Sequence, residues 1–100
     1  MAYKIVWLPT AEKRFNQVIV YLEKHWTAKE IETFIRKTND VVAILTVSPL
    51  TFRKSTSKKI HEVLVTKHNL LLYRVKGKRV ELLTFFDTRQ HPTKKFRNES

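Results

Sequence analysis

The hydrophobic periodicity of this chain changes at residue 50, and this change constrains the fold more than any other feature. Up to that point, apolar side chains recur every three or four positions, as in the buried stripe of an amphipathic helix. After residue 59, β-branched, aromatic and aliphatic residues form three short runs that are typical of strands. Because 100 residues suffice for one compact core, we expect helices from the first half to pack on a sheet from the second half.

One short strand and two helices are predicted in the first half. A strand over residues 3–8 ends at Pro9, and the Thr10 hydroxyl is expected to cap the first helix. Thr27 and Glu30 have the spacing of a capping box, so a second helix begins after almost no linker. With so short a connection, the two helices should fold back on each other as an antiparallel hairpin.

The second half predicts a loop over residues 50–59 and strands over residues 59–66, 70–75 and 80–86. Gly77, the only glycine of the chain, is expected to form a two-residue type II′ turn with the next residue. The turn sets three cross-strand pairs: Val75 with Val80, Tyr73 with Leu82, and Arg74 with Glu81. The predicted fold is therefore an α+β domain of order β-α-α-β-β-β over residues 1–90, followed by a polar C-terminal tail over residues 91–100. Its helical hairpin packs on one face of a small, mostly antiparallel sheet.

The charge of the chain is large and uneven. Twenty Lys and Arg residues against nine Asp and Glu give a formal net charge of +11, and residues 51–100 carry thirteen of the twenty cations but only four of the nine acids. Such an excess repels itself unless an anionic partner is near. The sequence thus predicts a partner that is either a polyanion or an acidic protein.

The cations of the predicted loop are the first candidate binding residues. Arg53, Lys54, Lys58 and Lys59 could together neutralise phosphates of a nucleic acid. The alternative is a solvated loop that only joins a helix to a strand. Arg89 and His91 form a second candidate, because a histidine beside an arginine could act as a general acid or base.

Several kinds of site are not predicted. No cysteine is present, the four histidines lack the spacing of a metal site, and a single glycine cannot make a nucleotide-binding loop. We therefore expect neither a metal nor a cofactor, and Trp7 and Trp26 are expected to be core residues. The longest apolar run, residues 41–45, is far too short to span a membrane, so a cytoplasmic protein without a membrane partner is expected.

Several segments in order resemble the RelE/ParE superfamily of toxins from bacterial type II toxin–antitoxin pairs. The likeness lies in the opening strand, Pro9-Thr10-Ala11, Ser48-Pro49, the basic loop, the strand His68–Val75, and the closing segment Leu82–Pro92 with its Arg-x-x-Pro tail. This resemblance implies a RelE/ParE-like fold and a growth inhibitor that a cognate acidic antitoxin neutralises by covering the basic patch and the sheet rim.

The branches of the superfamily imply different chemistry. RelE-like members are metal-independent, ribosome-dependent endoribonucleases that cut messenger RNA, and their site residues would fall at His61, Val63 and Leu70 and near Arg89 and His91. Leu70 stands where an arginine is expected, and only Arg89 and His91 fit. ParE-like members lack the nuclease set and act on DNA gyrase.

The sequence thus favours a ParE-like toxin that is not an enzyme. Two alternatives stay open: a ribosome-dependent nuclease using Arg89, His91 and the Lys58-Lys59 pair, and a small basic nucleic-acid-binding module. The residues expected to contact the target or nucleic acid gather on the side of the sheet away from the helices; they are Arg53, Lys54, Lys58, Lys59 and Arg89.

Overall fold

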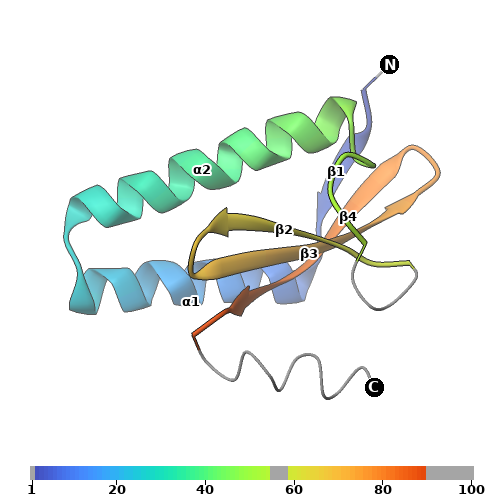
Figure 1. Cartoon of the computed structure of the whole chain (residues 1–100). Helices are drawn as coiled ribbons and strands as arrows, with labels where there is room; N and C mark the ends of the chain where they lie inside the picture. Colours follow the sequence, from blue (N-terminus) through green and yellow to red (C-terminus); the bar gives the residue numbers. More distant parts are fainter. Residues whose placement is uncertain (1, 55–58, 90–100) are drawn as a thin grey trace.

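The computed structural model describes residues 2–54 and 59–89, which form two helices and a four-stranded sheet (Figure 1). In chain order the elements are β1 (Lys4–Trp7), α1 (Pro9–His25), α2 (Ala28–Val47), β2 (His61–Thr66), β3 (Asn69–Lys76) and β4 (Arg79–Asp87). The predicted order and the α+β class are confirmed. The predicted tail over residues 91–100 lies outside the described residues.

The sheet has the strand order β1-β4-β3-β2. The pairs β2–β3 and β3–β4 are antiparallel, whereas β1 lies parallel to β4, with Lys4 beside Arg79 and Trp7 beside Leu82. The first strand of the chain therefore borders the last one, and β2 is the other edge of the sheet. Both helices cover the same face of this sheet (Figure 1).

Helix α1 begins two residues earlier than a cap at Thr10 would place it. Pro9 is its first residue, Leu8 is the N-cap, and no side chain caps its N-terminus, so the prediction that Thr10 is the cap was wrong. A proline suits this position because its φ angle is already helical and the missing N–H would have no partner there. Helix α2 begins as expected at the capping box, where the Thr27 N–H lies 3.3 Å from the Glu30 carboxylate.

The turn between β3 and β4 also follows the prediction. Gly77 has a φ of 60°, a conformation that costs glycine little and other residues more. The two-residue turn sets the register, and all three predicted cross-strand pairs, Val75–Val80, Tyr73–Leu82 and Arg74–Glu81, are present. The same register places Lys76 directly opposite Arg79.

The core lies between the helices and the sheet. Phe34 of α2 is fully buried and stacks on Phe15 of α1, with ring centroids 5.1 Å apart, and Phe85 of β4 lies 5.9 Å from Phe34. Trp7 packs edge-on against Phe15, as expected of a core residue. Aromatic pairs of this kind add about 1 kcal/mol each beyond their buried area.

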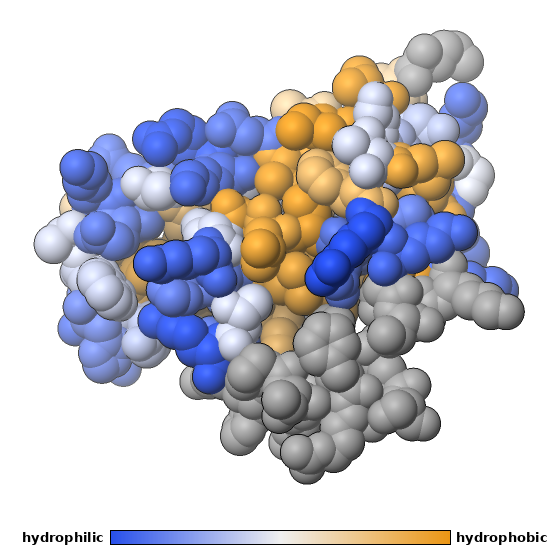
Figure 2. Space-filling model, viewed as in Figure 1, coloured by the Kyte–Doolittle hydropathy of each residue, from blue (hydrophilic) through white to orange (hydrophobic). Residues whose placement is uncertain are grey.

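Hydrophobic surface remains exposed between α2 and β2 (Figure 2). The exposed apolar side chains of these two elements include Ile44, Val47 and Leu64. The helix surfaces elsewhere in this view are largely hydrophilic. Within the described ranges, neither helix combines the length and the apolar character that crossing a membrane requires.

Candidate functional site

Two of the predicted loop cations lie beside the start of β2. The backbone of Lys54 pairs with that of His61, and the Glu62 N–H donates to the Arg53 carbonyl at 3.0 Å. The Arg53 guanidinium lies 2.6 Å from the carboxylate of buried Glu62, yet three quarters of the Arg53 side chain is exposed. Lys59 is exposed as well. Lys58 lies outside the described residues.

Buried polar contacts fix the chain where it enters this loop. The Tyr73 hydroxyl donates to the Pro49 carbonyl at 2.6 Å, and its ring stacks on His61 with centroids 5.2 Å apart. Nδ1 of His61 lies 3.0 Å from the Phe52 carbonyl. Burial raises the pKa of Tyr73 to about 12, because the phenolate would lose hydration that the protein does not replace. The entry to the basic loop is thus attached to the middle of the sheet.

Arg89 lies at the opposite end of the sheet. It follows β4, whose last residue Asp87 pairs with Asn69, whereas Arg53 and Lys54 lie beside β2 at the level of Tyr73. Four residues of strand, roughly 13 Å, separate Asn69 from Tyr73. The Arg89 guanidinium also lies over the ring of Tyr21 in α1, 5.6 Å from its centroid. Arg89 is therefore on the helix side, and the expectation that it joins the loop cations away from the helices is wrong.

The Arg89 side chain is held by Asp87. Its Nε and one terminal nitrogen lie 3.2 Å from the two carboxylate oxygens, and its backbone N–H donates to the same carboxylate at 2.8 Å. Burial pushes the pKa of Asp87 upward, but these hydrogen bonds outweigh it and hold the pKa below its usual value. Hydrogen bonding to Asp87 likewise raises the pKa of Arg89. A phosphate approaching Arg89 would have to compete with this carboxylate.

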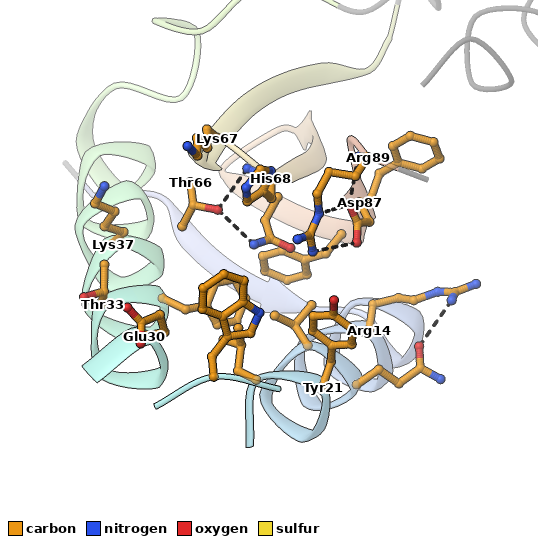
Figure 3. Close-up of a pocket in the computed structure, with 18 of the residues that line it drawn as sticks. Arg14, Tyr21, Glu30, Thr33, Lys37, Thr66, Lys67, His68, Asp87 and Arg89 are labelled. Carbon is orange, nitrogen blue, oxygen red and sulfur yellow. Dashed lines mark hydrogen bonds and ion pairs between the residues drawn. The ribbon is translucent and has the colours of Figure 1, made fainter. Parts of the chain in front are cut away.

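Arg89 borders a groove between the helical hairpin and the end of the sheet. Figure 3 shows Arg14, Lys37 and Lys67 around this groove, together with Tyr21 and His68. Trp26 also lines it and is 51% exposed, so the prediction that Trp26 is a core residue was wrong. The groove combines cations with exposed aromatic rings, a composition that suits an anionic ligand with an apolar part.

The positions that the RelE-like branch would use do not form a nuclease site among the described residues. Leu70, where an arginine is expected, is buried. Val63 belongs to the hydrophobic core, and His61 is buried against Tyr73. His91 lies outside the described residues. Across residues 2–54 and 59–89, no three histidine or acidic side chains are grouped as metal ligands would be.

A further cationic surface was missed by sequence reasoning. The β3–β4 hairpin and the strand beside it bring together Lys4, Arg74, Lys76, Lys78 and Arg79. The acidic group among them is Glu81, which lies 2.5 Å from Arg74 and 2.8 Å from Arg79. The Arg74 hydrogen bond is the main reason that the pKa of Glu81 is lowered. The run Lys76-Gly77-Lys78-Arg79 was the signal that could have revealed this surface.

Comparison with solved structures identifies the fold. No family model and no curated protein matches the sequence. The structure resembles a chain of the chromosomal ParDE toxin–antitoxin system of P. aeruginosa, with a TM-score of 0.71 and 12% identity, covering 85% of this chain and 95% of that one. It also resembles a YoeB/ParE toxin from Agrobacterium tumefaciens, with a TM-score of 0.62 and 16% identity over 84% of this chain and 96% of the other.

A third similar structure is a chain of the DinJ–YafQ toxin–antitoxin complex of E. coli, with a TM-score of 0.60 and 12% identity over 91% of this chain and 98% of the other. This chain thus has the RelE/ParE-like fold that the sequence resemblance implied. At 12–16% identity these structures show that the fold is shared, and they do not assign roles to the site residues of this chain.

Proposed function

We propose that this chain is the toxin of a bacterial type II toxin–antitoxin pair, a growth inhibitor that an acidic antitoxin neutralises. The observation that carries the proposal is the fold, which follows the ParDE structure over 85% of this chain and 95% of that chain. The net charge of +11 is complementary to the negative charge of an acidic antitoxin.

Among the possible targets we favour DNA gyrase over the ribosome. Cleavage of RNA would require cations that are free to stabilise the charge developing on the phosphate. Arg89 is instead paired with Asp87, and position 70 is a buried leucine. The loss of one such stabilising group typically costs about 10²–10³ in rate. These observations support a ParE-like toxin that acts by binding rather than by catalysis.

The ribonuclease remains the second candidate because Arg89 is not isolated. Lys67 and His68 lie on the same groove (Figure 3), so a substrate phosphate that displaced Asp87 would meet further positive charge. This candidate makes Arg89 a catalytic residue, whereas the gyrase proposal does not.

Induced expression in a bacterial host tests the class of protein first. Growth should stop, and co-expression of a cognate acidic antitoxin should restore it. Normal growth at a verified level of folded protein would contradict the toxin proposal.

The purified toxin then separates the two targets. We expect inhibition of gyrase supercoiling, and no cleavage of messenger RNA by translating ribosomes. Arg89→Ala is compared with Arg14→Ala, which removes a cation from the same groove without touching the Asp87 pair. Ribosome-dependent cleavage that Arg89→Ala abolishes and Arg14→Ala preserves would overturn the gyrase proposal in favour of the nuclease.

A further inference from the structure

The exposed end of the β3–β4 hairpin carries a row of cations across three strands. Lys4 of β1 lies beside Arg79 of β4, and Arg79 lies opposite Lys76 of β3. All three residues are exposed. Figure 1 shows this hairpin projecting at the end of the molecule away from the α1–α2 connection.

Strand alternation puts these side chains on the face that the helices leave open. Ile5 and Val80 pack with the core, so their neighbours Lys4 and Arg79 point to the other face. Neighbouring strands lie about 4.8 Å apart, and the row therefore spans roughly 10 Å. We define Lys4, Lys76 and Arg79 as the hairpin row.

The hairpin row is under electrostatic strain in the isolated chain. Like charges directly opposite each other on a sheet are destabilising, and the row contains two such neighbouring pairs. Glu81 offsets only part of the charge, because its carboxylate is already bonded to Arg74 and Arg79. A bound polyanion would relieve this repulsion.

We propose that the hairpin row binds the phosphate backbone of a nucleic acid. Successive phosphates of one strand rise about 3.4 Å along the helix axis and lie farther apart along the strand itself, so a row of roughly 10 Å can contact about two of them. Lysine and arginine contacts of this kind position a protein on nucleic acid without reading its sequence.

The surroundings of the row favour nucleic acid over an acidic protein. Protein interfaces usually centre on aromatic or aliphatic side chains that become buried. The large exposed apolar residues of the described chain lie elsewhere, on the helices, at Trp26 after α1, at Leu50 after α2 and on β2. The hairpin end offers charge without an apolar centre.

The row is distinct from the groove at Arg89. Lys76 and Arg79 lie at one end of β3 and β4, and Asn69 and Asp87 at the other, roughly 23 Å away along the strand. Arg53 and Lys54 lie nearer the row, beside β2 at the level of Tyr73. The inference does not depend on whether gyrase or the ribosome is the target, since both work on nucleic acid.

The test measures binding of the purified full chain to a labelled single-stranded RNA and a labelled DNA duplex of mixed sequence, by fluorescence anisotropy at several salt concentrations. The variant is Lys4→Gln/Lys76→Gln, which leaves Arg79 and its partner Glu81 in place. The matched control is Lys13→Gln/Lys24→Gln, which removes the same charge from exposed positions of α1.

We expect the hairpin variant to raise Kd roughly tenfold at moderate salt and to lower the slope of log K against log salt by about 2, one unit for each lost phosphate contact. The control should change both values much less. If the Kd values for RNA and DNA rise equally, the row binds the phosphate backbone that both share. If only one Kd rises, the row is specific to that nucleic acid.

Two results would overturn the inference: equal weakening by the control variant, which would mean that only net charge matters, and an unchanged Kd in a folded hairpin variant. A third result would assign the row to a protein partner instead: the natural protein binds an acidic peptide, the hairpin variant does not, and both bind nucleic acid equally well. Growth arrest is scored separately, so a failure here does not decide the proposed function.

Discussion

Replacing Tyr73 by phenylalanine should destabilise the protein at neutral pH and make its stability less sensitive to high pH. The variant loses the hydrogen bond from the phenol to the Pro49 carbonyl, 2.6 Å long and buried, while the ring can remain against His61. Leaving a buried carbonyl without its donor costs about 1–3 kcal/mol. We therefore expect the free energy of unfolding at pH 7 to fall by about 1.5 kcal/mol.

The pH dependence follows from the pKa of Tyr73, which burial raises in the folded protein from its ordinary value of 10.0 to about 12. Because the folded pKa is the higher one, the stabilisation is fully present below pH 10 and is lost as pH rises towards 12. At pH 11 the unfolded phenol is largely ionised and the folded one is not, which removes about 1.4 kcal/mol from the natural protein. Tyr73→Phe escapes this loss.

The two proteins should therefore have nearly equal stability at pH 11. Urea unfolding followed by circular dichroism at pH 7, 9 and 11 measures the difference, and Tyr3→Phe, which removes the hydroxyl of a half-buried tyrosine, is the comparison. A stability gap that stays the same from pH 7 to pH 11 would refute the assignment of a raised pKa to Tyr73.

Two further substitutions test the hairpin. Gly77→Ala should lower the free energy of unfolding by about 1 kcal/mol. The cost is backbone strain at a φ of 60° and not a clash, because an added Cβ would meet nothing within 4 Å. Gly77→Asn should cost less, and equal urea midpoints for the alanine variant and the natural protein would contradict this account. Glu81→Gln should flatten the acid limb of the stability curve. Its pKa is lowered, so the charged carboxylate stabilises the fold above about pH 4.5 and this contribution disappears as pH falls; an unchanged pH profile in urea unfolding between pH 3 and 7 would show that its pairs with Arg74 and Arg79 contribute nothing.

The sequence predicted those features of the fold that depend on local signals. The capping box at Thr27, the change of periodicity at residue 50 and the turn at Gly77 each act within a few residues, and the structure has all three. The Thr10 cap failed because Pro9 itself suits the first position of a helix.

The candidate site was harder to predict because it depends on which strand ends meet. Arg53 lies before β2 and Arg89 after β4, and the register of the strands puts them at different levels of the sheet. Trp26 was placed in the core from its helical spacing, yet it lies past the end of α1 on the groove. The run Lys76–Arg79 signals two members of the hairpin row, but the third, Lys4, joins them through the parallel pairing of β1 with β4, which no local pattern reveals.

The position of β1 beside β4 has a consequence for when the complete sheet can form. Strand β1 can pair with β4 only after β4 has been synthesised, since Lys4 to Trp7 pair with Arg79 to Leu82. Contacts between residues so distant in the chain slow folding. A nascent chain still lacking its closing strand can form its helices but not the complete sheet. Synthesis thus leaves an interval in which β1 has been made but has no strand to pair with.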